Sequence, residues 1–111
     1  MSKKPPTEPK PRWRKLASDR WGVKLGPLVA VVIDYSDSEQ ARRARRPCWI
    51  WRVGSGSINQ PWAFKSIIAA SGARDVRKLP RSRDAAQREA LDAALGYAAA
   101  ITKAVQALVL P

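Results

Sequence analysis

The sequence has no histidine and a single cysteine, Cys48. An intrachain disulfide therefore cannot form, and a zinc site built from cysteine and histidine is excluded. Histidine is also the usual side chain for proton transfer near neutral pH, so its absence argues against an enzyme that uses general acid–base catalysis. Basic neighbours are expected to lower the pKa of Cys48, but without a histidine to activate it we do not assign it as a nucleophile. We therefore expect no catalytic residue, no metal site and no cofactor.

Acidic residues are scarce as well: 9 aspartates and glutamates stand against 21 lysines and arginines, which leaves a net charge of +12 in 111 residues. A positive field of this kind attracts polyanions and speeds their association. Most of the basic residues are arginines, whose planar guanidinium group grips phosphate oxygens and stacks on bases. A GC-rich genome also yields much arginine and alanine, but it does not explain the shortage of acidic residues.

No long apolar run is present. Residues 1–15 are charged and rich in proline, unlike a secretory signal peptide. The weakly charged stretch 93–111 is rich in alanine and is interrupted by Lys103 and Gln106, which makes it a poor membrane span. We expect a cytoplasmic protein with no membrane partner.

The length suits one domain, which we place at residues 16–111 behind a flexible tail of residues 1–15. The tail carries prolines at positions 5, 6, 9 and 11 among basic residues. Proline lacks a backbone donor and stiffens the chain, and such a segment cannot bury enough apolar surface to offset the entropy lost on ordering. We expect the tail to be disordered by itself.

Three segments have the pattern of strands. Residues 21–25 and the Val- and Ile-rich residues 28–35 flank a Gly-Pro turn, and residues 48–53 follow after a long polar segment. That polar segment, residues 36–47, is expected to be a loop or a loop with one helical turn. Residues 73–81 are expected to form a short edge strand or a linker.

Two segments have the pattern of helices. Residues 61–71 begin with a proline after capping residues and end before Gly72, and a second helix is expected from Ser82 to about Leu108. One apolar stripe of this second helix consists of Leu91, Leu95, Ala98, Thr102, Val105 and Val109. It packs on the sheet, or also on a second copy of itself to form a homodimer. The sequence thus predicts an α+β fold, with a small antiparallel sheet of three to four strands packed against two helices.

Basic residues gather in three clusters that could bind phosphate. Each cluster could instead be a solvated surface. One cluster has four arginine side chains in five residues, and these repel one another unless an anion neutralises them. This favours binding for that cluster, the first of the three. The first cluster consists of Arg42, Arg43, Arg45 and Arg46; the second of Arg74, Arg77, Lys78, Arg81 and Arg83; and the third, in and near the tail, of Lys10, Arg12, Arg14 and Lys15.

Tryptophan is abundant, with 5 residues. Trp49 and Trp51 alternate along a strand and point to one face, while Arg52 points to the other. If the tryptophan face is open, it is a stacking platform for unpaired bases; if it is covered, both side chains belong to the core. Trp13, at the end of the basic tail, either contacts a partner or folds back onto the domain.

These features favour a non-catalytic protein that binds DNA or RNA, mainly through phosphate contacts from Arg and Lys and largely without sequence specificity. No zinc-finger spacing, ribonucleoprotein motif or helix-turn-helix pattern is present. The alternative is a small protein-interaction factor or inhibitor, of the kind that phages and plasmids encode, which binds a host complex that handles nucleic acid. In that case the uncharged C-terminal helix and the tryptophans would form the contact.

Overall fold

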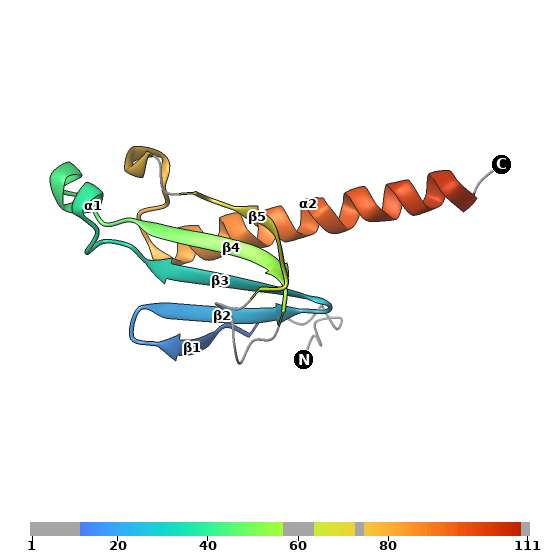
Figure 1. The fold of residues 1–111 in the computed structure, drawn as a ribbon, viewed down its shortest axis with the longest axis horizontal. Coiled ribbons are helices and arrows are strands. Elements are labelled where there is room, and N and C mark those ends of the chain that lie inside the picture. The colour runs from blue at the N-terminus through green and yellow to red at the C-terminus, as the bar shows by residue number, and fades with distance from the viewer. Residues whose placement is uncertain (1–11, 57–63, 73–74, 110–111) are drawn as a thin grey trace, which may run out of the picture.

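The five strands follow one another across an antiparallel sheet, each paired with the next in sequence (Figure 1). The computed structural model describes residues 12–56, 64–72 and 75–109. The strands are β1 (Arg14–Ala17), β2 (Arg20–Leu25), β3 (Leu28–Asp34), β4 (Trp49–Ser55) and β5 (Ser66–Ala70). The helices of this part of the chain are α1 (Glu39–Ala44), the short 3-10 helix η1 (Val76–Lys78) and α2 (Arg83–Val109). The fold is therefore α+β.

The three expected strands are confirmed as β2, β3 and β4, but the sheet is larger than expected. β1 adds an edge beside β2, and Arg14 and Lys15, which were expected in the tail, lie in it. β5 adds the other edge beside β4. Residues 1–11, which hold Lys10 and most of the tail expected at residues 1–15, lie outside the described residues.

The helix predicted at residues 61–71 is wrong where the structure describes that segment. Residues Ser66–Ala70 form β5, and the expected cap and first turn lie outside the described residues. Isoleucines favour a strand, and β4 offers a free edge whose backbone groups gain hydrogen bonds when β5 pairs with it. Gly54 permits the close approach, because a Cβ there would collide with the Ser66 carbonyl oxygen. Tertiary pairing thus overrides the helical spacing of the apolar residues.

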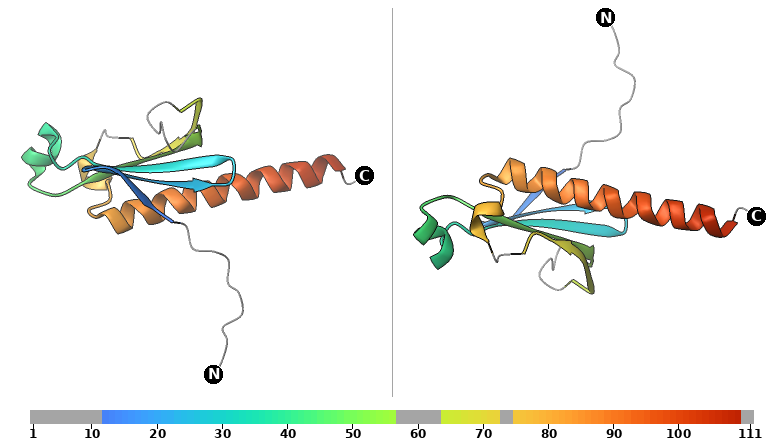
Figure 2. Two further views of the ribbon diagram at one scale, coloured as in Figure 1. Left: turned by 90° about the horizontal axis from the view of Figure 1, so that it is seen from below. Right: turned by 90° about the horizontal axis from the view of Figure 1, so that it is seen from above.

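One face of the sheet is covered by α2, which lies across β3 and β4 (Figures 1 and 2). Large side chains on the sheet meet small ones on the helix, so that the helix can approach closely. This core contains Val23, Ala30, Val53, Ala90 and Ala94, with Trp13, Leu25, Leu28, Trp51 and Ala93 packed at its margin.

The face of α2 that meets the sheet differs from the predicted one. Ala86, Ala90 and Ala94 are buried, whereas Leu95, on the predicted stripe, is 68% exposed. Large tryptophan and valine side chains already fill the space above the sheet, so the helix turns its alanines inward and leaves leucine outside. Ser82 caps the helix as expected, since its hydroxyl accepts a hydrogen bond from the Ala85 amide over 3.1 Å.

A second apolar cluster holds α1 and η1 against one end of the sheet. Its buried residues are Ala41, Cys48, Ile50, Val76 and Leu79, with Ile33 and Tyr35 packed against them. The segment 75–81 is therefore a linker anchored by two apolar side chains, with a 3-10 turn in place of an edge strand. None of the helices in the described part of the chain combines the length and apolar character that crossing a bilayer requires.

Candidate nucleic-acid interface

Two of the basic clusters meet at one end of the sheet, where α1, η1 and the start of α2 lie together (Figure 1, left). Arg46 joins them: its guanidinium donates to the carbonyl oxygens of Arg77 and Leu79 over 2.8 and 2.9 Å. The amide of Trp49 donates to the carbonyl of Pro80 over 2.8 Å, which fixes the linker to β4. Residues about 30 positions apart are thus held in one surface, which we call the basic end.

The basic residues of this end differ in how far they are already neutralised. Arg43 pairs with Glu39, and Arg77 with Asp75. The pKa of the Asp75 carboxyl is lowered, chiefly by the hydrogen bond that the Arg77 amide donates to it. The Arg77 side chain and nearby positive charge lower it further. Among the described residues of this end, Arg42, Arg45, Lys78 and Arg81 are exposed and have no hydrogen bond, ion pair or ring contact, whereas Arg83 contacts a ring only.

Arg45 has an unusual backbone conformation for a non-glycine residue, with φ of 53°. It caps the C-terminus of α1 in the left-handed region, where its amide donates to carbonyls of the last turn. Glycine or asparagine would adopt this conformation at lower cost. An arginine held here is a strained residue with a free, exposed guanidinium, which is a pattern found at binding sites.

The start of α2 adds a hollow of about 480 Å³ whose lining includes Arg83 of the second cluster and Lys15 of the third. The Arg83 guanidinium lies 4.2 Å from the ring centroid of Trp21, in a cation–π contact. Lys15 of β1 and the half-buried Trp49 also line the hollow. The structure therefore brings Lys15 of the third cluster close to Arg83 of the second. Arg12 and Arg14 of the third cluster are exposed, and Arg74 of the second lies outside the described residues.

The tryptophan platform is covered where Trp51 lies. Trp51 packs against the core beneath α2, and its indole nitrogen donates to a Glu89 carboxylate oxygen over 3.3 Å. Trp13 also packs against this core, so it folds back onto the domain. Of the two alternatives for Trp51, the structure shows packing against the core, and stacking stays a prediction for Trp49.

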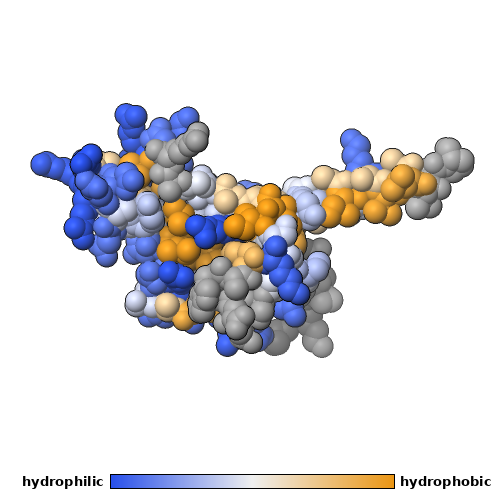
Figure 3. Space-filling view, in the orientation of Figure 1, coloured by the Kyte–Doolittle hydropathy of each residue, from blue (hydrophilic) through white to orange (hydrophobic). Residues whose placement is uncertain are grey.

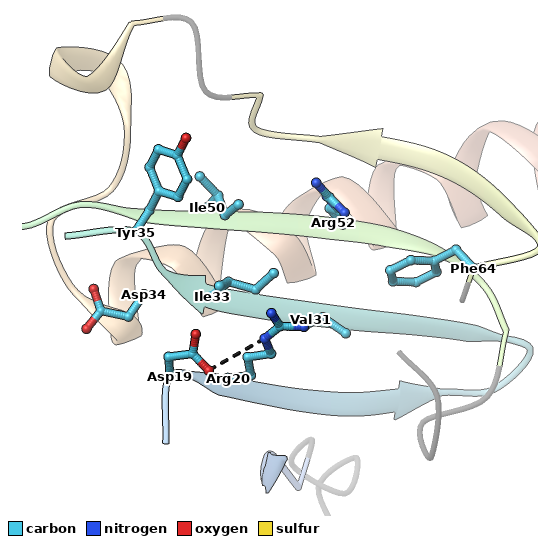
Figure 4. A pocket seen from close by; sticks show the side chains of 9 residues that line it. All are labelled: Asp19, Arg20, Val31, Ile33, Asp34, Tyr35, Ile50, Arg52 and Phe64. Atoms are coloured by element: carbon cyan, nitrogen blue, oxygen red, sulfur yellow. Dashed lines mark ion pairs between the residues drawn. The ribbon is translucent and has the colours of Figure 1, made fainter. Parts of the chain in front are cut away.

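No described helix lies over the opposite face of the sheet, which we call the open face (Figure 2), although Val29 and Val31 on this face are buried. A groove of about 440 Å³ runs there, with an apolar floor formed by β3 and β4. Figure 3 shows this face, with apolar surface at its centre and hydrophilic surface toward the basic end. The groove is lined by Asp19, Arg20, Val31, Ile33, Asp34, Tyr35, Ile50, Arg52 and Phe64 (Figure 4).

Arg52 lies in this groove, on the face away from Trp51 that strand alternation predicts, and has no side-chain partner among the described residues. Sequence reasoning missed three other groove residues: Arg20, Tyr35 and Phe64. Arg20 pairs with Asp19 over 3.5 Å. The face on which Arg20 lies could have been predicted, because side chains alternate between the two faces along a strand. Arg20 pairs with Ile33, which pairs with Ile50, and Ile50 is on the same face as Arg52. Phe64 could not, because it was assigned to a helix.

Cys48 and Asp34 both make hydrogen bonds within the fold. Burial raises the pKa of the Cys48 thiol more than the neighbouring Arg46 lowers it, which corrects the expected direction. Its Sγ donates to the carbonyl of Tyr35 over 3.5 Å. The carboxylate of Asp34 accepts from the Ser36 amide over 2.9 Å, closing a turn. No cluster of three or more metal-ligating side chains occurs within residues 12–56, 64–72 and 75–109.

No family model, no curated protein and no solved structure matches this chain.

Proposed function

We propose that this protein binds nucleic acid without catalysis, and that the basic end holds the phosphate backbone. The observation that carries the proposal is the bridge from Arg46 to η1, which gathers Arg42, Arg45, Lys78 and Arg81 on one surface. Like charges held together repel one another and reduce stability. A phosphate backbone neutralises them and releases its counterions on binding.

The groove on the open face extends this surface for a single strand. Arg20 and Arg52 lie beside its apolar floor, and the aromatic rings of Tyr35 and Phe64 stand at its two ends (Figure 4). Arginines contact phosphate, while aromatic rings stack on unpaired bases of any sequence. A duplex keeps its bases stacked inside and cannot use such rings, so we expect a preference for single-stranded DNA or RNA.

The direct test is a titration with labelled single- and double-stranded oligonucleotides over a range of salt concentrations. We expect single strands to bind more tightly and the affinity to fall steeply with salt, since counterion release drives binding. Binding that is absent at low salt, or that does not change with salt, would overturn the proposal.

A matched pair of variants locates the interface. Arg42→Gln with Arg45→Gln removes two positive charges from the basic end, and Arg88→Gln with Lys103→Gln removes two exposed charges from α2. The first variant should lower the salt slope of log K by about 2, about 1 for each lost phosphate contact. The second should leave the slope close to wild type. Equal losses would mean that net charge alone, and not the basic end, governs binding.

A further inference from the structure

The C-terminal half of α2 extends beyond the sheet into solvent (Figures 1 and 2). The helix has 27 residues, which makes it about 40 Å long at 1.5 Å per residue. Its buried residues, Ala86, Ala90 and Ala94, all lie in the first half. Every residue from Leu95 to Leu108 is exposed. We call residues 95–109 the overhang.

The overhang is apolar, unlike an ordinary solvent-exposed helix. Among the described residues, it holds all but one of the exposed large hydrophobic side chains. These are Leu95 (68% exposed), Tyr97 (38%), Ile101 (44%), Val105 (51%) and Leu108 (86%). Figure 3 shows apolar surface along the end of the helix that projects beyond the sheet. A surface of this kind marks an interaction site more often than a solvated face.

The stripe that packs on the sheet continues along the overhang. Tyr97 follows Ala90 by seven residues, Ile101 follows Ala94 by seven, and Leu108 follows Ile101 by seven. Seven residues are nearly two helical turns, so these side chains lie in line with the buried alanines. Positions 90, 94, 97, 101, 104 and 108 alternate spacings of four and three, which is the seam that pairs one helix with another.

We infer that the overhang pairs with the same segment of a second copy, with the two helices antiparallel. The charges favour this occupant: the overhang has one charged residue, Lys103, on the side away from the seam, in a chain of net charge +12. An acidic partner would be drawn to the basic end, whereas the overhang offers no complementary charge. Two copies joined antiparallel place their basic ends far apart, which minimises their repulsion.

The available area agrees with a weak, self-complementary dimer. A specific interface needs about 1,000 Å² in total, or about 500 Å² from each copy. The overhang is about 22 Å long and about 10 Å wide, and one face of it supplies area of this order once its projecting side chains are included. The interface is therefore at the small end of the range, and we expect a dissociation constant on the order of 10 μM. This inference does not depend on nucleic-acid binding.

Sedimentation equilibrium of the full chain, from about 1 to about 300 μM, tests the inference. We expect a monomer–dimer equilibrium that strengthens with salt, because salt screens the repulsion between two basic copies. Nucleic-acid affinity would change with salt in the opposite direction, so the two proposals can fail separately. A chain that stays monomeric over the whole range, at high and low salt, would overturn the inference.

Variants on the two sides of the overhang form the control. Ile101→Gln with Leu108→Gln should weaken dimerisation by at least tenfold, while Leu95→Gln, on the far side of the helix, should leave it within about twofold. Unfolding measured by circular dichroism should be cooperative for wild type and for both variants, since none of the substituted residues is in the core. A dimer that survives the double change, or that is lost equally with Leu95→Gln, would overturn the assignment of the face.

Engineered cysteines test the antiparallel direction, since the native Cys48 is buried. Ile101 is near the centre of the overhang and should meet its own counterpart, so Ile101→Cys should form an intermolecular disulfide under mild oxidation. Leu108→Cys should not, because its counterpart is at the other end of an antiparallel pair. Crosslinking of both would show a parallel pair, and crosslinking of neither would place the contact elsewhere; either result overturns the arrangement.

Discussion

The guanidinium of Arg46 donates to the carbonyl oxygen of Leu79 over 2.9 Å, across 33 positions of sequence. A second bond, to the carbonyl of Arg77, is 2.8 Å long. The Arg46 side chain is half-buried, and its Nε has no hydrogen-bond partner among the described residues. An arginine that the sequence suggests as a phosphate ligand is therefore a structural bridge, and it positions the side chains that remain free.

Replacing this bridge should destabilise the fold. Arg46→Met keeps much of the side chain's length but removes two charge-assisted hydrogen bonds, so we expect a loss of about 1–3 kcal/mol in the free energy of unfolding. Urea denaturation measures it. Arg42→Met, on an exposed side chain of α1, should change stability by no more than about 0.5 kcal/mol. Equal effects of the two changes would contradict the bridging role.

Arg45 should separate stability from binding. Arg45→Gly relieves the left-handed backbone at φ 53°, and we expect stability to be unchanged or to rise by up to about 1 kcal/mol. The same change removes a free cation from the basic end, so nucleic-acid affinity should fall. Denaturation and oligonucleotide titration of one sample measure both. A variant that binds as well as wild type would remove Arg45 from the interface.

Two glycines should respond to alanine in opposite directions. A Cβ at Gly54 would collide with the Ser66 carbonyl oxygen and the Phe64 ring, so Gly54→Ala should cost about 2–3 kcal/mol by disturbing the pairing of β4 with β5. Gly96 is exposed within α2 with no atom near the added Cβ. Gly96→Ala should therefore stabilise by about 0.5–1 kcal/mol through helix propensity. Thermal unfolding distinguishes the two, and a tolerated Gly54→Ala would argue against β5.

Cys48 should make stability fall at alkaline pH. Its folded-state pKa is raised above the ordinary value of 9.0, chiefly by burial. The unfolded chain therefore ionises first, so the contribution is complete below pH 9.0 and is lost as the pH rises toward the folded-state pKa. Cys48→Ala should show a smaller loss of stability than wild type between neutral pH and about pH 10. The native thiol should also react slowly with a disulfide reagent until the protein unfolds, and a fast reaction would contradict its burial.

The central part of the fold could be predicted from sequence, because its signals are local. The Gly-Pro turn separates β2 from the Val- and Ile-rich run of β3, and Ser82 marks the start of α2. β5 could not be predicted, because its isoleucines also fit a helical spacing and only the free edge of β4 decides between the two. The inward face of α2 depends on the volume of the tryptophans on the sheet, which no pattern within the helix reveals.

The candidate site was predicted as residue types but not as a surface. The arginine segment and the linker are adjacent only because Arg46 connects them, and a contact across about 30 residues has no local sequence signal. Strand parity correctly separated Arg52 from Trp51. It did not show which face α2 covers, so the sequence left open whether Trp51 stacks on a ligand or packs in the core.

The measurement that tests the account most directly is an NMR titration of the full chain with a single-stranded oligonucleotide at low salt, with backbone amides and arginine Nε–H groups observed. We predict shifts concentrated at Arg42, Arg45 and Lys78 of the basic end and at Arg52 and Tyr35 of the open face. Residues 95–109 should change little. Shifts confined to α2, or no shifts at all, would contradict the account.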